Sequence, residues 1–519
     1  MRVRSQLSTR RTATALLAVG VLALTACGTR LPDKDFTAAG SSTLSQGNGN
    51  NTASNAPGTN APGTNAQGNQ GTQGTQGTKG SSNTKGGKGS NGSNGQQLPA
   101  GQLFGGACGG GSSGGKSSDV GVTGSAITIG NVSSIHNQFG SSQFSPNVHG
   151  LDAFVKHCNA VGGVNGRKIV LLPCDDGGGA SGNSRCVNSL ISKNAFAFVA
   201  NNVFAYGGAA TLSAKNRPDI GGEPIEGPPY YKYSNFYNIY GTGYPRDNKQ
   251  VGYKGKYWGT AEIATWVHAH YPQVKSVGIV YYTQTDSQRG AAVEAAGFDQ
   301  VGIKTHLHAV NLSNGNYQGA VAQMQADGDE MVMDALDDVG NQQLCQAMDQ
   351  PMQSGAWKPI AKISTISTWN ADVGKNFAPP CRDIVWAAGS SASYSDSSVP
   401  MAQTFLQDFQ QFEPGVPVAQ WGLEGYAAGI WFAQAAHSCG ASLTRTCVEH
   451  WLDSQKSLGA SGLMSKDTNF QHVAYSTSSS GPACVSIVKW DNGKNSWDTL
   501  ANINRNCYPN LKYFDYDIG

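Results

Sequence analysis

The chain has 519 residues with nearly balanced charges, 36 lysines and arginines against 34 aspartates and glutamates, and a formal net charge of +2. Because no basic stripe runs through the part of the chain with apolar patterning, we expect no nucleic-acid partner. The chain is also longer than one hydrophobic core usually serves, so we expect more than one lobe or domain.

The first residues have the pattern of an export signal. Arginines at positions 2, 4, 10 and 11 precede an apolar run from Ala13 to Leu24, which is too short to span a bilayer comfortably. The following "LTAC" resembles the lipobox of bacterial lipoproteins, in which the cysteine receives a lipid. We therefore predict a lipoprotein signal peptide over residues 1–27, with lipid on Cys27 and an extracytoplasmic protein anchored to the cell membrane. The alternative is an ordinary signal peptide in which Cys27 is incidental.

The next ninety or so residues have low complexity. Residues 28–118 are almost wholly Gly, Asn, Ser, Thr and Gln. Such a composition cannot bury enough apolar surface to offset the entropy of ordering, so we predict a disordered tether over 28–118. A Gly-rich coil of that length has a typical end-to-end distance of roughly 50 Å.

Strands and helices are then predicted in alternation. The first group has strands at 126–134, 167–176 and 195–202, with helices at 146–163 and around 187–191. A second group continues with strands at 276–282, 304–310 and 330–336, and with helices at 257–270, 288–298, 317–328 and 341–348. Two further helices are expected around 405–412 and 423–437, and a hairpin over 483–500 with Asn492 and Gly493 at its turn.

Two runs of alternating strands and helices predict an α/β protein made of two doubly wound parallel-sheet lobes. Between the runs, residues 226–247 are rich in proline, glycine and tyrosine, and we expect an irregular crossing there. A second crossing is expected near residue 390. We assign residues 119–240 and 390–480 to lobe I and residues 241–389 and 481–519 to lobe II, joined by a multi-crossing hinge.

The cysteines of an exported chain favour disulfides. There are 11, and removing Cys27 leaves an even number. Short loops suggest four pairs, and one pair remains: Cys174 with Cys186, Cys345 with Cys381, Cys439 with Cys447, Cys484 with Cys507, and by elimination Cys108 with Cys158. The connectivity stays open at this point.

A metal site is the competing account of these cysteines, but the chain has no C-x-x-C motif. His306 and His308 would share one face of a strand, and His268 and His270 lie close together near a helix end. Neither pair has a convincing third ligand nearby in the sequence. We therefore expect solvated or structural histidines, no metal and no cofactor.

The adjacent carboxylates Asp175 and Asp176 raise the question of acid–base catalysis. Neighbouring residues at a strand end point in opposite directions, so the two side chains cannot easily flank one bond. We expect them to order the loop instead.

A family resemblance begins at "HCNAVGGVNGRKIVLLPCDD", residues 157–176. Its pattern, N-A-x-G-G-x-x-G followed by D-D, resembles the first helix and second strand of the leucine/isoleucine/valine-binding type of periplasmic binding protein, which has the type I fold. The resemblance extends from about Ser125 to Gly519. It implies two lobes that close on a small molecule at the carboxyl ends of the strands, a permease of an ABC importer as partner, a monomer, and no enzyme activity.

The resemblance also implies candidate ligand contacts in lobe I. Phe139 stands in the turn after the first strand, where the family offers an aromatic side chain. Phe204 and Tyr206 stand in the third loop, where the family usually has small hydroxyl residues. Gly222 and Glu223 stand where a small-x-Thr signature is expected. These departures put the usual carboxylate clamp in doubt and favour a ligand with a ring or an apolar face.

In lobe II, the matching loops supply Thr285, Asp286, Asp337 and Ser367. If both aspartates face the cleft, a cationic or multiply hydroxylated ligand is attractive. The alternative is that one or both of them cap the following helix, because aspartate is a favoured N-cap residue.

Taken together, these patterns predict a lipid-anchored solute-binding protein that delivers an amino acid, amide or related polar molecule to an ABC importer. A ligand-binding sensor or receptor of the cell envelope is the alternative, since it would have the same fold. An envelope hydrolase would need a nucleophile, a metal or a carboxylate pair in the cleft, and the sequence offers no recognisable one.

Overall fold

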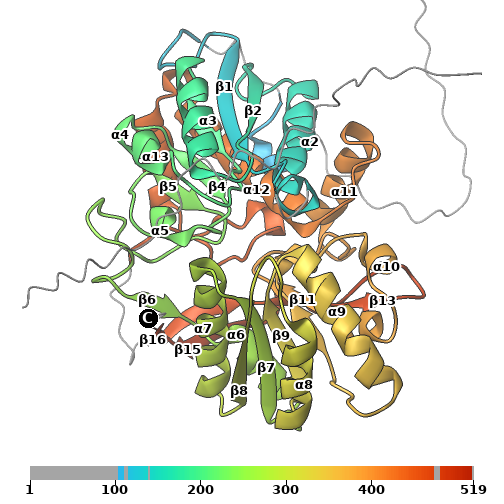
Figure 1. The fold of residues 1–519 in the computed structure, drawn as a ribbon. Helices are drawn as coiled ribbons and strands as arrows, with labels where there is room; N and C mark the ends of the chain where they lie inside the picture. Colours follow the sequence, from blue (N-terminus) through green and yellow to red (C-terminus); the bar gives the residue numbers. More distant parts are fainter. Residues whose placement is uncertain (1–102, 110–114, 138–140, 473–479, 517–519) are drawn as a thin grey trace, which may run out of the picture. The chain divides into compact units, whose positions relative to one another are not determined.

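The computed structural model describes residues 103–109, 115–137, 141–472 and 480–516. All of them lie within one compact unit of the chain, residues 90–519. This unit contains two large sheets, and we call each sheet with the helices packed on it lobe I and lobe II (Figure 1). The predicted α/β class with two parallel-sheet lobes is confirmed.

Lobe I contains a five-stranded parallel sheet with the strand order β2-β1-β3-β4-β5. Helices cover both faces of the sheet, and its inner strands accordingly consist mostly of apolar and small residues. The edge strand β2 exposes several of its residues. The strands are β1 (Ala126–Ser133), β2 (Lys168–Asp175), β3 (Ala197–Val199), β4 (Asp219–Gly222) and β5 (Phe236–Asn238).

The central helix of lobe I is α12, which packs against α2 and β4 and is buried at nearly every position up to Ala436. At the crossing with α2, a Cβ on Gly150 would lie 1.7 Å from the carbonyl oxygen of Gly422, so only glycine allows this approach. The helices of lobe I are α1 (Ser141–Phe144), α2 (Pro146–Ala160), α3 (Ala180–Ser192), α4 (Ala209–Ala214), α5 (Gly227–Tyr230), α11 (Pro400–Phe412), α12 (Gln420–Cys439) and α13 (Arg445–Ser454).

The expected irregular crossing at 226–247 is more ordered than predicted. It contains α5 and β5, and β5 is the fifth strand of the lobe I sheet. Prolines at the start of α5 are tolerated because the first amides of a helix have no intrahelical acceptor. Phe236 and Tyr237 are fully buried, and burial of these aromatic side chains favours the strand despite the glycines and prolines around it.

Lobe II contains a seven-stranded sheet with the order β14-β13-β11-β10-β9-β7-β8. The five strands from β11 to β8 are parallel, and the expected hairpin β13–β14 adds to them in antiparallel orientation. The strands are β7 (Ser276–Tyr282), β8 (Lys304–Val310), β9 (Met331–Ala335), β10 (Lys362–Ser364), β11 (Val385–Gly389), β13 (Ser486–Asp491) and β14 (Ser496–Ala501).

The helices of lobe II are α6 (Glu262–His270), α7 (Thr285–Gln300), α8 (Tyr317–Asp327), α9 (Asp338–Gln353) and α10 (Val373–Asn376). The helix expected over 257–270 is wrong at its start. Residues Tyr257–Gly259 form strand β6, which pairs with β16 (Phe514–Tyr516) near the end of the chain. Only a partner more than two hundred residues away makes this short strand possible. A second small sheet pairs β12 (Ser480–Cys484) with β15 (Cys507–Lys512).

Five disulfides form, each within one lobe, and they are the pairs suggested by loop length and elimination. They link Cys108 to Cys158, Cys174 to Cys186, Cys345 to Cys381, Cys439 to Cys447, and Cys484 to Cys507. Because all the cysteines in the described residues are paired, none of them offers a thiolate to a metal.

The segment before β1 differs from the tether expected over 28–118. Residues Leu103–Gly106 form a short 3-10 helix, and Phe104 is fully buried against the rings of Phe154 and Tyr426. Cys108 then joins this segment to α2. One aromatic side chain and one disulfide supply the burial and the cross-link that hold residues 103–109 on lobe I. The signal peptide, Cys27 and the tether up to residue 102 lie outside the described residues.

Among the helices of the described residues, none has the length and apolar character needed to cross a membrane.

A buried ion pair holds the centre of the lobe II sheet. Lys362 in β10 and Asp334 in β9 are both fully buried, with 2.8 Å between Nζ and the nearer carboxylate oxygen. Ser364 donates a hydrogen bond to the same carboxylate, and Lys362 also donates to Ser364 and to the side-chain oxygen of Asn341 in α9. The pair therefore fixes two neighbouring strands and a helix close to the ends of those strands.

Replacing Lys362 by methionine should lower the free energy of unfolding by about 3–5 kcal/mol, because the Asp334 carboxylate then stays buried without its cation. Urea-induced unfolding measures this loss. The matched control is Lys304→Met on the exposed end of edge strand β8, which should change stability by less than about 0.5 kcal/mol. Equal effects of the two substitutions would contradict the role of the ion pair.

Candidate functional site

A cavity of about 290 Å³ lies between the two lobes, at the carboxyl ends of the parallel strands. Such a position is typical of ligand sites in open α/β sheets. Lobe I lines it with Gln143, Phe144, Phe204, Glu223, Tyr240 and Trp421, and lobe II lines it with Tyr282, Gln284, Asp286, Leu336, Asp337 and Ser367, among others.

Three aromatic rings form one wall of the cavity. Phe144 stacks on Trp421 with ring centroids 5.8 Å apart, and it meets Phe204 edge to face at 6.2 Å. Trp421 is the second residue of α12, and its buried Nε1–H has no hydrogen-bond partner within the described residues. The wall therefore offers flat apolar surface together with one donor for a ligand.

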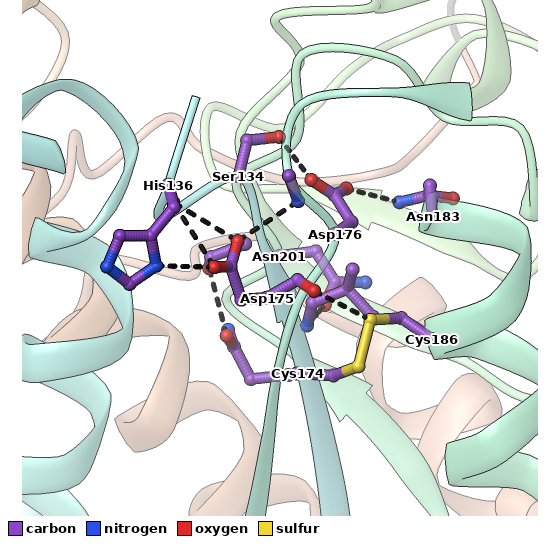
Figure 2. The surroundings of a disulfide bond; sticks show 12 residues. Ser134, His136, Cys174, Asp175, Asp176, Asn183, Cys186 and Asn201 are labelled. Carbon is purple, nitrogen blue, oxygen red and sulfur yellow. Dashed lines mark hydrogen bonds and ion pairs between the residues drawn. A yellow bond between two sulfur atoms is a disulfide. The ribbon is translucent and has the colours of Figure 1, made fainter. Parts of the chain in front are cut away.

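A polar network behind the wall positions Phe204. The backbone N–H of Phe204 donates to Ser134 Oγ at 3.0 Å, and the Ser134 hydroxyl donates to Asp176 at 2.7 Å. Asn183 donates to the other oxygen of Asp176, next to the disulfide between β2 and α3 (Figure 2). This network links the loop after β3 to the end of β2.

The neighbouring carboxylate of Asp175 is directed to different partners, the backbone N–H and Nδ1 of His136 (Figure 2). Asp175 also accepts a hydrogen bond from the N–H of Gly177. The two adjacent carboxylates thus order two separate loop segments, as predicted, and do not face one shared substrate bond.

Two buried glutamates meet beneath the lobe I side of the cavity. The Tyr240 hydroxyl lies 3.1 Å from a carboxylate oxygen of Glu223 and 2.9 Å from one of Glu424. Asn147 donates to Glu223, and Ser391 donates to Glu424. Burial raises the pKa of Glu223 to about 7, and burial together with the nearby Glu223 charge raises the pKa of Glu424 well above its usual value. The close pair favours a state in which at least one glutamate is protonated.

Asp337 lies at the lobe II face of the cavity and has both of the roles considered from the sequence. It is the N-cap of α9, where Oδ1 accepts a hydrogen bond from the N–H of Gly340 at 2.7 Å. The Tyr282 hydroxyl donates to the same oxygen at 3.1 Å, and both side chains line the cavity. Burial raises the pKa of Asp337.

Asp286, in the first turn of α7, also lines the cavity. Burial raises its pKa, while an ion pair with Arg289 one turn later opposes this shift. Ser367 lines the cavity as well, with its hydroxyl donating to the carbonyl oxygen of Leu336 at 2.9 Å. Among the described residues that line the cavity, none is a lysine or an arginine.

The lobes touch directly beside the cavity. The side-chain oxygen of Gln143, in lobe I, accepts a hydrogen bond of 3.1 Å from the backbone N–H of Asp338, at the start of α9 in lobe II. The first amides of a helix have no intrahelical acceptor, so this glutamine satisfies a donor of the opposite lobe.

Of the residues expected from the sequence, the structure brings Phe204, Glu223, Asp286, Asp337 and Ser367 to the cavity. It does not bring the other three described candidates, Tyr206, Gly222 and Thr285, among the lining residues; Phe139 lies outside the described residues.

Each of these three has a different position. Tyr206 is in the core of lobe I, where its hydroxyl donates to the buried carboxylate of Asp219 and accepts from Asn201. A Cβ on Gly222 would lie 1.9 Å from the hydroxyl of Tyr230, so this glycine allows a close packing contact. Thr285 begins α7 and is exposed.

Sequence reasoning missed Gln143, Phe144, Tyr240 and Trp421. Tyr240 lies two residues after the end of β5, in the tyrosine-rich segment for which the sequence predicts only a crossing. A crossing between lobes passes the cleft, so this segment did carry a usable signal. Trp421 comes from a helix more than two hundred residues after Phe204, and no local pattern connects the two.

The chain matches the family model described as periplasmic binding protein over residues 126–495. No curated protein matches it. Similar solved structures include an extracellular ligand-binding receptor from Verminephrobacter eiseniae, with 15% identity, a TM-score of 0.55, and 72% of this chain and 100% of that chain covered.

Two further similar structures have TM-scores of 0.55. One is a solute-binding protein of an ABC transporter from R. palustris in complex with benzoate, with 12% identity and coverage of 74% of this chain and 97% of that chain. The other is a leucine-binding protein from Thermotoga maritima, with 13% identity and coverage of 73% and 99%. At these identities the likeness concerns the fold.

The glutamate pair predicts a pH dependence of stability. Raised pKa values mean that the folded chain holds protons that the unfolded chain releases above about pH 4.5, so this stabilisation is present at low pH and is lost as pH rises through about 7. Glu424→Gln should reduce the fall in melting temperature between about pH 5 and about pH 8. Calorimetry at both pH values measures the difference. Asp299→Asn, an exposed carboxyl-to-amide change, is the control and should leave the fall unchanged; equal falls in wild type and Glu424→Gln would refute the prediction.

Proposed function

Because the chain belongs to the periplasmic binding protein family, whose members bind solutes outside the cytoplasm and are not enzymes, we propose that it captures a small molecule between its two lobes and delivers it to an ABC importer. The observation that carries this proposal is the cavity itself, which residues of both lobes line at the carboxyl ends of their strands. A ligand that touches both lobes stabilises their closed arrangement, and a permease can respond to that arrangement.

We infer the ligand class from the chemistry of the lining. Phe144, Phe204 and Trp421 favour a ring or an apolar body of the ligand. Trp421 Nε1–H offers a donor, and Gln284 Oε1, on the opposite lobe, offers an acceptor; neither atom has a partner within the described residues. The ligand is therefore amphipathic, with at least one acceptor and one donor group.

The charges of the lining favour a neutral or cationic ligand. Glu223, Asp286 and Asp337 are acidic and no lysine or arginine lines the described cavity, although Arg289, just outside the lining, pairs with Asp286. A carboxylate ligand such as the benzoate bound by the R. palustris protein would meet like charge here unless these groups were protonated. A compound with an aromatic or branched apolar body and an amine or amide group fits better.

Thermal unfolding of the purified full-length chain, screened against amines, amides, amino acids and aromatic acids, should identify the ligand. At a hundred times its Kd, a ligand adds about 2.7 kcal/mol of stability, enough to raise the melting temperature by a degree or more. We expect the shift from amines or amides with an apolar body, and none from benzoate.

Substitutions in the aromatic wall test whether the ligand binds in the cavity. Phe204→Ala and Trp421→Ala should each weaken binding by about tenfold or more, because each removes a ring from the wall. Phe412→Ala, at the end of α11 outside the lining, is the aromatic control and should bind as wild type does. Undiminished binding by both wall variants would contradict the cavity as the site.

Measuring uptake of the ligand by cells distinguishes a role in transport from a role in sensing. If a deletion of the gene abolishes import of the identified ligand, the chain serves an importer. If import persists while a ligand-dependent response of the cell is lost, the chain is a sensor or receptor component, and the delivery part of the proposal is wrong.

We also propose that the protein is anchored to the membrane through lipid on Cys27. The charged start, the short apolar run and "LTAC" support this, and an anchored protein would remain near its permease. Cys27→Ser should move the protein from the membrane fraction to the soluble fraction of the cell envelope or to the medium. Immunoblots of these fractions measure this. Ser41→Ala, beyond the lipobox, is the control; continued membrane association of Cys27→Ser would rule out the anchor.

A further inference from the structure

A group of histidines and aspartates lies on lobe II at the end of the sheet opposite the cavity. His306 and His308 are two residues apart on edge strand β8, so their side chains share one face of the sheet. Asp329 lies in the turn between α8 and β9, on the amino-terminal side of β9, whereas the cavity residues follow the carboxyl end of that strand. Asp329 therefore supplies the third ligand for the two histidines, which could not be identified from the sequence.

Two buried polar atoms in this group have no hydrogen-bond partner within the described residues. They are Nε2 of His308 and Oδ2 of Asp329, and they lie 3.8 Å apart. The His308 side chain is 5% exposed and that of Asp329 is fully buried. Leaving a buried carboxylate oxygen and an imidazole nitrogen without partners is costly, so their approach to one another calls for a ligand.

The hydrogen bonds around the group leave the lone pair on Nε2 of His308 free. Its Nδ1 lies 3.2 Å from the side-chain oxygen of Gln323 in α8, and donation to that oxygen places the proton on Nδ1. Nε2 is then an acceptor facing the carboxylate. Outer partners of this kind orient metal-binding histidines. The Trp357 indole N–H donates to the backbone oxygen of Asp329 at 2.8 Å and holds the turn in place.

The charges also favour a cation. Within the described part of the chain, both ion pairs of Asp329 are with histidines, His306 and His308, and none is with a lysine or an arginine. Asp327, exposed at the end of α8, adds a second carboxylate, and its ligand oxygen lies within 4.8 Å of those of His306 and Asp329. The C-terminal end of α8 contributes further negative potential.

We propose that His306, Asp327 and Asp329, whose ligand atoms all lie within 4.8 Å of one another, bind a divalent transition metal such as Zn²⁺, with His308 beside Asp329 as the fourth ligand. A tetrahedral site with bonds of about 2.1 Å separates neighbouring ligand atoms by about 3.4 Å. The separations of 2.7 Å for His306 Nδ1 to Asp329 Oδ1 and 3.8 Å for His308 Nε2 to Asp329 Oδ2 lie on either side of that value. Because His308 lies outside the group of three, its imidazole must move toward the ion to join them, and the exposed Asp327 leaves an open route for the ion.

The site is independent of the cavity because it lies at the other end of the β7, β8 and β9 strands. By joining edge strand β8 to the turn before β9, a bound ion would stabilise lobe II without contacting the solute. Metal binding therefore tests this site separately from the proposed transport function.

The test is calorimetric titration of the untagged full-length chain, stripped with chelator, with ZnCl₂ alone. We expect one saturable ion per chain and a rise in melting temperature, and absorption bands of bound Co²⁺ should show four-coordinate geometry. His306→Ala and His308→Ala should each weaken binding by about tenfold or more. His268→Ala, an exposed histidine on α6, is the matched control and should bind as wild type does.

Three outcomes would overturn the site: no saturable binding, wild-type affinity in both histidine variants, or equal loss in His268→Ala. If His308→Ala does not fold, His306→Ala and Asp327→Asn decide the question, because both residues are partly or fully exposed and their substitution leaves the core intact. Wild-type affinity in these two variants would also refute the proposal.

Discussion

The lobe II side of the cavity depends on the buried ion pair between Lys362 and Asp334. Asp334 stands near the end of β9, just before Leu336 and Asp337, and Lys362 opens β10, which leads to Ser367. Neither charge can exchange its partner for water, so the two strands keep one register at the point where both reach the cavity. The geometry of the lobe II side of the cavity therefore depends on Lys362 and Asp334, two charged side chains that do not line the cavity.

The two lobes present different chemistry to the same small space. Lobe I offers stacked rings and a pair of glutamates that burial and mutual repulsion keep partly protonated. Lobe II offers Asp337 and Asp286, whose charges are only partly met by a tyrosine hydroxyl and an arginine. A ligand of the proposed kind, with an apolar face and a separate polar group, would match both surfaces.

The sequence predicted the regular parts of the fold because alternation of apolar residues is a local signal. Short loops suggested four of the disulfide pairs, and elimination left Cys108 with Cys158, although the sequence alone kept the connectivity open. Tyr206 was expected in the cavity because its loop was correctly placed, but a residue two positions from Phe204 can point into the core, and only Asp219 reveals that it does. The aromatic wall joins Phe144, Phe204 and Trp421 from three distant segments, and the partner of His306 comes 23 residues later, at Asp329. Such contacts depend on tertiary packing and leave no local pattern.

The disulfide between Cys108 and Cys158 has a mechanical consequence. It joins the N-terminal part of the chain covalently to α2, and Phe104 packs beside it on the same lobe. A load applied to the chain before residue 104 therefore enters the protein through lobe I alone and ends at a covalent bond. The connections between the lobes lie outside this path, so a force applied to the N-terminal part of the chain reaches lobe II only through lobe I.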